Sequence, residues 1–212
     1  MWLVQAYSGT KTLSSVIRVA GIDPSLANWG MAKMLLNTDT LELELEQIRT
    51  ITTEPRGKNK VVRQNSHDLQ RASELFDGFQ AWMKDCVIGF SEIPSGSQRA
   101  RAALGFGVAI GVLASSPVKL IEVMPVETKL ASVGTKTAEK HEIIAWAAAR
   151  YPHVPWMTYH NDVITKGKLM RRAGELHADN EHAADACAVV HAGIQTPQFR
   201  QLLALLKSAN QT

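Results

Sequence analysis

The sequence has few cysteines. Its 212 residues include only Cys86 and Cys187, each inside an apolar run. There is no Cys-x-x-Cys pair, so the spacing indicates neither a cysteine-ligated zinc site nor a disulfide framework. We expect two buried, reduced thiols, which are typical of a protein that works in a reducing compartment.

Long hydrophobic runs are also missing. The most apolar stretch, AALGFGVAIGVLASSPV, is shorter than the roughly 20 residues that span a bilayer. The first residues, MWLVQAYSGTKTLSS, lack the basic start and long apolar run of a secretory signal. We therefore expect no membrane partner and a protein that is not secreted, located in the cytoplasm or in an equivalent organelle or viral compartment.

Neither sign of charge is in large excess. Lys and Arg number 23, Asp and Glu 20, and the formal net charge is +3. Hydrophobic residues make up 45% and charged residues 20%, an ordinary globular composition. The mild basicity permits a nucleic-acid partner without requiring one. The length suits one substantial domain, which we place at 16–212 after an extension at 1–15.

Hydrophobic periodicity predicts strands first and helices later. The predicted strands are 15–23, 28–37, 41–54, 86–92 and 118–125, with the second and third as antiparallel neighbours. Helices are predicted at 61–84, across SGSQRARAALGFGVAIGVLAS, at 180–193 and at 197–208, and for about 14 residues within TKTAEKHEIIAWAAARYP, with Thr137 as N-cap. Residues 152–179 show no clear period. This order indicates an α/β fold, a mixed sheet with helices on its faces.

Three acids stand at element boundaries. Asp23 ends the first predicted strand, Glu92 ends the fourth, and Asp185 lies near the start of a late helix. Adjacent central strands present their ends side by side, and a crossing helix can bring a third carboxylate there. Such carboxylates repel one another unless a cation lies between them. Each acid alone is more simply a cap or a surface charge, but together they indicate a site for hard divalent cations.

Four segments in order resemble the motifs of the RuvC-type Holliday-junction resolvases. GIDPSLANWGMA is similar to the first motif, a strand that ends in Asp and is followed by a Gly on the next strand. IGFSE resembles the second, VGTKTAEKHEII the segment that opens a later helix, and EHAADACAVVHAG the last. Each motif alone is weak, and their order over residues 16–193 carries the resemblance.

The resemblance implies an RNase H-like fold with a five-stranded mixed sheet flanked by helices. It also implies a homodimeric endonuclease that cuts a four-way DNA junction symmetrically, leaving 5′-phosphate and 3′-hydroxyl ends. The expected cofactor is Mg²⁺, two ions per active site, with Mn²⁺ as a substitute. No nucleotide cofactor is expected.

The resemblance also assigns residues. Asp23, Glu92 and Asp185 would hold metal, and His182 falls where family members carry a further Asp or a His. Lys140 would neutralise charge near the scissile phosphate. Lys129 and Lys140 match family lysines that face the DNA backbone. Positive charge alone, without the resemblance, adds further expected DNA contacts, namely Lys136, Arg99, Arg101, Lys166, Lys168, Arg171 and Arg172. Glu181 is left as a charge that favours the helix dipole or as a substitute ligand.

The sequence departs from the family pattern at several positions. Ser25 stands where a Gly is usual, and Ser95 stands where some members carry an aromatic residue that helps to open the junction. Another side chain must then open the junction, or the choice of substrate is looser. Arg56, Lys58, Lys60 and Arg63 form a second basic segment that could follow phosphates.

Other functions stay open at this point. A catalytically silent junction-binding protein and a broader branched-DNA nuclease of the same fold are the alternatives. A phosphotransferase of the actin and sugar-kinase type needs a second nucleotide-binding domain, which 212 residues do not show. Gly107 and Gly111, one helical turn apart, indicate close packing, either against a second subunit or within the monomer.

Overall fold

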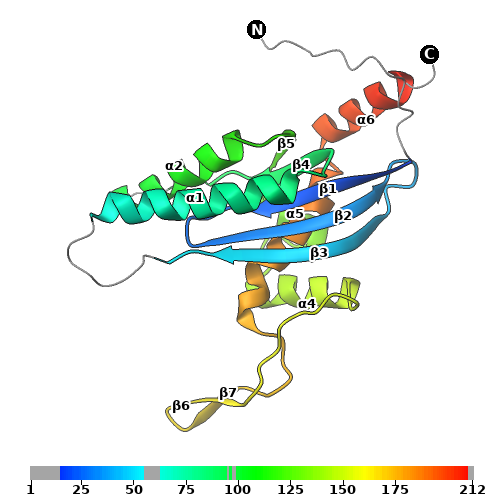
Figure 1. Ribbon diagram of the computed structural model, residues 1–212. Helices are drawn as coiled ribbons and strands as arrows, with labels where there is room; N and C mark the ends of the chain where they lie inside the picture. Colours follow the sequence, from blue (N-terminus) through cyan, green and yellow to red (C-terminus); the bar gives the residue numbers. More distant parts are fainter. Residues whose placement is uncertain (1–14, 55–62, 95, 97–98, 210–212) are drawn as a thin grey trace.

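One five-stranded sheet organises the chain (Figure 1). The computed structural model describes residues 15–54, 63–94, 96 and 99–209. The strand order is β3-β2-β1-β4-β5. The strands are β1 (Val16–Asp23), β2 (Asn28–Asn37), β3 (Leu43–Thr52), β4 (Ile88–Glu92) and β5 (Lys119–Val123). The first three are antiparallel neighbours, whereas β4 runs parallel to β1 and β5 parallel to β4. The predicted mixed α/β sheet is confirmed.

Both faces of the sheet are covered, because the central strands are apolar on both sides. On β1, Ala20 and Ile22 belong to the core beneath α1 (Gln64–Met83) and α2 (Ala100–Ala114). Ile17 and Val19 belong to the core on the opposite face, with α5 (Glu181–Gly193) and α6 (Pro197–Ala209). Such near-continuous apolar runs are typical of strands buried on both faces. No helix of the described chain is long and apolar enough to cross a membrane.

Helix α5 lies unusually close to the sheet. A Cβ added to Gly21 would stand 2.0 Å from the carbonyl oxygen of Ala186, and one added to Gly30 would stand 2.0 Å from that of His182. Glycine at these two strand positions therefore lets the helix backbone approach β1 and β2. This contact sets where the first turn of α5 lies relative to the ends of the strands.

Two helices lie between β5 and the segment 152–179, for which the sequence showed no clear period. The first, α3 (Pro125–Ser132), was not predicted, because eight residues give little periodic signal and Pro125 reads as the end of a strand. The second, α4 (Lys140–Arg150), begins three residues later than Thr137. The predicted N-cap is wrong because Glu139 and Glu142 form a reciprocal capping box, in which Glu142 Oε2 accepts the Glu139 N–H at 2.7 Å.

Residues 158–176 form an arm that stands away from the sheet (Figure 1). Its tip is a two-stranded hairpin of β6 (Val163–Thr165) and β7 (Lys168–Arg171), and its base is closed by a bridge between Thr158 and Leu176. Lys166 and Gly167 have φ angles of 52° and 75°, as a tight type I′ hairpin turn requires. Strands of three and four residues are too short to show a period, so the sequence did not predict this hairpin.

Candidate active site

The predicted acids meet at one edge of the sheet. Asp23 is the last residue of β1 and Glu92 the last of β4, and because these strands are parallel neighbours their carboxyl ends lie together. Helix α5 begins over this edge and adds His182 and Asp185 from its first turns. The charges of Asp23 and Glu92 both raise the pKa of Asp185, which shows that the three carboxylates share one electrostatic environment.

Asp23 and His182 are directly bonded. Nδ1 of His182 lies 2.7 Å from Oδ2 of Asp23, and both side chains are half-buried. A carboxylate only accepts, so Nδ1 is the donor. This hydrogen bond raises the pKa of His182 above its usual value. In the neutral ring the bond leaves the lone pair on Nε2, as in metal-ligating histidines whose other nitrogen donates to a carboxylate.

Glu92 is held by α3. The hydroxyl of Thr128, itself buried, donates to Oε1 of Glu92 at 2.6 Å. Burial raises the pKa of Glu92, and the bond from Thr128 opposes that shift in part. Sequence reasoning missed Thr128, because α3 itself was not predicted and a lone Thr carries no motif.

Asp185 carries the strongest perturbation among these acids. Burial raises its pKa from 3.8 to about 7, and the charges of Asp23, Glu181 and Glu92 add to the shift. An aspartate on the first turns of a helix normally ionises readily, since the helix dipole favours it there. Here the buried excess of negative charge outweighs that effect.

This donor set fits a divalent cation. Carboxylate oxygens are the ligands that Mg²⁺ prefers, and a cation between them would remove the repulsion that raises the pKa of Asp185. Glu92 and Asp185 line the same small cavity, of about 150 Å³, together with Thr128, Lys129 and Lys140. As the side chains stand, no group of three or more His, Cys, Asp or Glu among the described residues is arranged to hold a metal.

Lys140 lies beside the acids. It forms an ion pair with Glu181, and that contact raises its pKa, with smaller contributions from the charges of Asp185 and Asp23. The Lys140 side chain is 74% exposed, so it can also reach a phosphate in solution. Two roles were open for Glu181. In the structure its carboxylate pairs with Lys140, which is itself a predicted DNA contact.

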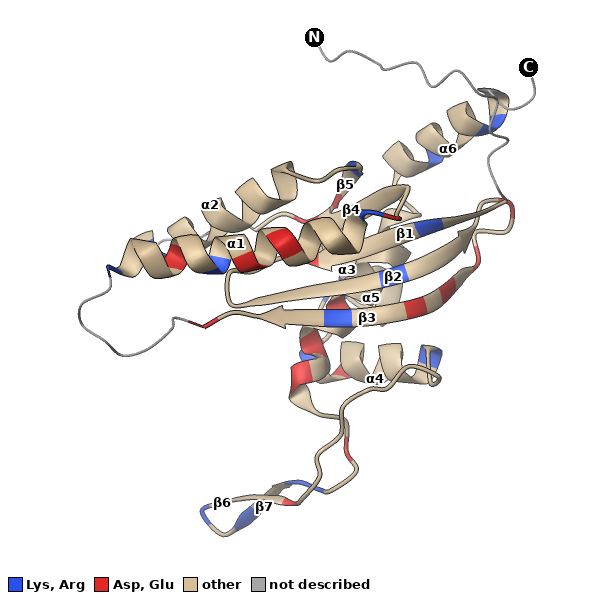
Figure 2. Ribbon diagram, in the orientation of Figure 1, with Lys and Arg blue, Asp and Glu red and all other residues tan. Residues whose placement is uncertain are grey.

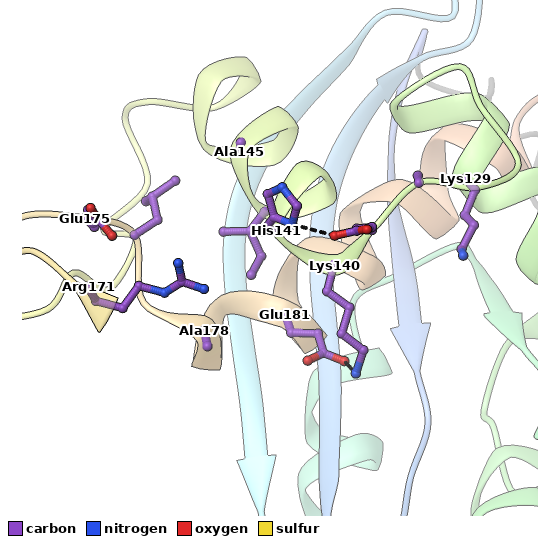
Figure 3. A pocket seen from close by; sticks show the side chains of 12 residues that line it. Lys129, Lys140, His141, Ala145, Arg171, Glu175, Ala178 and Glu181 are labelled. Atoms are coloured by element: carbon purple, nitrogen blue, oxygen red, sulfur yellow. Dashed lines mark ion pairs between the residues drawn. The ribbon is translucent and has the colours of Figure 1, made fainter. Parts of the chain in front are cut away.

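A larger cleft opens beside these residues (Figure 3). It measures about 740 Å³ and lies between α4 and the base of the arm. Its lining includes Lys129 and Lys140 on one side and Arg171 on the other, with apolar contributions from Ile144 and Leu176. The arm and the acidic edge are therefore parts of one continuous surface.

The remaining predicted DNA contacts lie in three places. Lys136 is exposed in the turn before α4, Lys166, Lys168 and Arg172 are exposed on the arm, and Arg99 immediately precedes α2. Arg101 forms two hydrogen bonds to the buried carboxylate of Asp68 on α1, which lowers the pKa of Asp68. That contact ties α2 to α1, so the charge of Arg101 is already compensated.

Some sequence predictions fall outside the described residues, namely those on Arg56, Lys58, Lys60 and Ser95 and on the 1–14 segment. Gly107 and Gly111 are described and exposed on α2. A Cβ at either position would meet no described atom within 4 Å. No described side chain packs closely on these two glycines, and contact with a second subunit stays a prediction.

Comparison with solved structures places the fold. No protein-family model and no curated protein matches the sequence. The structure of Thermus thermophilus RuvC in complex with a Holliday junction substrate is similar with a TM-score of 0.56 and 18% identity, over 83% of this chain and 92% of that one. A second structure of T. thermophilus RuvC gives a TM-score of 0.55 and 17% identity, over 89% and 97%. This chain therefore has the RNase H-like fold of RuvC, as a divergent example with low sequence identity.

Proposed function

We propose that this protein is a metal-dependent, structure-selective DNA endonuclease that resolves four-way junctions. One observation carries the proposal: two strand ends and the first turns of α5 bring Asp23, Glu92, His182 and Asp185 to one edge of the sheet. The RuvC fold supports it, since the same fold binds a Holliday junction in the T. thermophilus protein.

Asp23, Glu92, Asp185 and His182 would hold two divalent ions, Mg²⁺ or Mn²⁺. Bound there, such a pair supplies an activated water and neutralises the leaving oxygen of a phosphodiester. The protein's own groups orient this site: His182 fixes the carboxylate of Asp23, and Thr128 fixes that of Glu92. Cleavage of this kind leaves 5′-phosphate and 3′-hydroxyl ends that a ligase can seal.

Cationic side chains would bind the DNA backbone around the acids. Lys129 lies at the rim of the small cavity, and Lys140 is exposed beside it. Lys140 must exchange its partner Glu181 for a phosphate, an exchange that its exposure makes inexpensive. Lys136, Arg99 and the cations of the arm would extend the contact to flanking duplex. Arg101 contributes less, since Asp68 holds it.

A homodimer would match the two related cleavage points of a four-way junction. Helix α2 offers a surface for it. Leu104 and Ile110 are 44% and 42% exposed, and Gly107 and Gly111 leave open space between them for a partner helix. Phe76 of α1 extends this apolar surface, which we call the α2 face.

Substitution of Asp23 tests the proposal. Asp23→Asn keeps the shape of the side chain but removes a charge that would bind metal, so cleavage of a synthetic four-way junction in Mg²⁺ should fall below detection while junction binding stays within about 3-fold. Asp39→Asn, which alters an exposed acid in the turn between β2 and β3, is the matched control and should cut normally.

Three results separate the alternatives. A panel of four-way, three-way and flap DNAs with Mg²⁺ or Mn²⁺ distinguishes a junction resolvase from a broader nuclease. Binding without cleavage under any metal would identify a catalytically silent junction-binding protein. Full activity of Asp23→Asn would contradict the assignment of the site.

A further inference from the structure

The arm at residues 158–176 makes few contacts with the rest of the protein. Every residue from His160 to Glu175 is exposed. Two-stranded hairpins of this size are marginal in water when nothing packs against them. This one is held by its type I′ turn, by the bridge at its base and by a hydrogen bond from Ala173 N–H to Oδ1 of Asp162 at 2.8 Å. Its shape is set locally, while its surface stays free for a ligand.

Apolar side chains lie on this free surface. Ile164 and Leu169 are opposite each other across the hairpin, so their side chains share one face, and they are 64% and 41% exposed. Met170, 51% exposed, is the next residue along β7. Large apolar side chains are normally buried, so three exposed ones at the tip of a slender arm indicate a surface that binds a partner.

The charge of the arm identifies the chemistry of its partner. Lys166, Lys168, Arg171 and Arg172 are cationic, and the segment from Val163 to Arg172 contains no acid. Figure 2 shows positive charge at the turn of the hairpin and along β7, and β6 carries none. Four cations around an apolar pair suit a polyanion whose interior is apolar, namely nucleic acid with its phosphates outside and its bases stacked within.

The base of the arm adjoins the candidate active site. Arg171 and Leu176 line the same cleft as Lys140 and Glu181 (Figure 3). In Figure 3 the Arg171 side chain points from the arm into this cleft. A DNA strand whose phosphate reached Asp23, Glu92 and Asp185 would therefore pass the arm on its way out.

We propose that the arm is the wedge that opens the crossover of a branched DNA. Ile164 and Leu169 insert between bases at the branch point, and Lys166, Lys168, Arg171 and Arg172 bind the flanking phosphates. The inference rests on the proposed function. Apolar side chains inserted at a base step unstack it and bend the duplex.

The test measures base unstacking directly. A four-way junction with 2-aminopurine at the branch point is titrated with protein without divalent metal, so that nothing is cut. Fluorescence should rise with the wild-type protein. The double variant Ile164→Ser/Leu169→Ser should lose most of the rise while its junction affinity falls less than about 3-fold, because the phosphate contacts remain. Leu205→Ser, at an exposed apolar position on α6, is the matched control and should behave as wild type.

Cleavage separates the wedge from the nuclease. The double variant should cut a fully paired junction about 10-fold or more slowly, and a junction with unpaired bases at the branch point within about 2-fold of wild type. Equal loss on both substrates, or a normal fluorescence rise, would overturn the wedge. If wild-type protein cut neither substrate, the proposed nuclease would fail, and the fluorescence would still decide about the arm.

The phosphate contacts have their own readout. Lys166→Gln/Lys168→Gln should reduce the slope of log affinity against log salt by about 1 to 2, since each phosphate contact contributes about 0.9 on duplex DNA. An unchanged slope would contradict the DNA partner. The same holds if deletion of the hairpin leaves DNA affinity unaltered and the hairpin instead binds a protein.

Discussion

At the scale of single residues, the site is defined by charge that the fold forces together. Two strand-end acids and one helix acid share this edge, and burial, together with the charges of Asp23, Glu181 and Glu92, raises the pKa of Asp185 to about 7. His182 and Thr128 each bond one of the carboxylates and leave its second oxygen available. Both positioning contacts come from helices, whereas Asp23 and Glu92 come from strands.

His182 gives the first prediction at this scale. His182→Ala should reduce Mg²⁺-dependent junction cleavage by about 10- to 100-fold, because the contact that orients Asp23 is lost together with a nitrogen donor. His182→Asp should retain more activity than the alanine variant, since Mg²⁺ prefers oxygen ligands. Single-turnover cleavage rates check both. A wild-type cleavage rate for His182→Ala would show that His182 has no role in cleavage.

The pKa of Asp185 predicts how stability depends on pH in the metal-free protein. Its folded pKa, about 7, is above the ordinary 3.8, so the folded state loses stability as pH rises through that window, and the loss is complete above pH 7. Glu92 and His182, whose pKa values are also raised, act in the same direction.

Asp185→Asn removes this ionisation. With a chelator present, the variant should lose less stability between pH 5 and pH 8 than the wild type, by roughly 2 kcal/mol. Urea unfolding at the two pH values measures the difference. Mg²⁺ should stabilise the wild type more at pH 8 than at pH 5, because protons compete with metal for the carboxylate. Identical pH profiles would show that Asp185 is not buried among charges.

At the scale of elements, the position of α5 decides whether a site exists. The helix carries His182 and Asp185, and its first turn can reach the strand ends only because Gly30 has no side chain beneath it. Near its other end, Gly193 lies against the ring of Phe90 in the same way. A helix displaced outward would keep its sequence and lose its function.

Gly30→Ala should separate packing from chemistry. The new Cβ would stand 2.0 Å from the carbonyl oxygen of His182, so we expect unfolding free energy to fall by at least about 2 kcal/mol and cleavage to fall with it. Gly105→Ala, inside helix α2, is the control. Its Cβ would meet Leu26 atoms at 3.6 Å or more, which is ordinary contact, so stability should rise by about 0.5–1 kcal/mol because Ala favours a helix over Gly. Equal effects of the two would disprove the close approach.

At the scale of the whole molecule, the catalytic edge, the arm and the α2 face would have separate tasks. Under the proposals made above, the acids would cut, the arm would open the branch, and the α2 face would set two such units at related positions. The cleft at the base of the arm shares Lys129 and Lys140 with the small cavity that Glu92 and Asp185 line, while α2 covers the sheet face opposite to α5. Each task can therefore be removed by substitution without removing the others.

Ile110→Asp tests the dimer. An ionised side chain in the centre of the α2 face should raise the dimer dissociation constant by about 30-fold or more, which sedimentation measures. On a supercoiled plasmid with a cruciform, the monomer should give nicked circles where the dimer gives linear product. A matched Leu205→Asp on α6 should remain dimeric, and an Ile110→Asp variant that still dimerises would place the interface elsewhere.

The amino-acid sequence by itself determined the class of fold and the edge at which the acids meet. Apolar strands with acids at their ends predict that edge because parallel neighbours end together, and the order of four motifs named the resemblance. The sequence did not determine α3, and with it Thr128, because eight residues carry too little period. It predicted Arg101 as a phosphate contact without showing that Asp68, 33 positions away, would bind it.

Only the tertiary structure decided which side chains act on which. The bond from His182 to Asp23 joins residues 159 positions apart. The packing of α5 over Gly21 and Gly30 brings them together. The sequence of the arm shows no hydrophobic period, so only the structure shows that it is a hairpin and that its base lies beside the cleft. Local pattern specifies elements, whereas contacts between distant segments depend on how those elements pack, and the chemistry of this protein lies in those contacts.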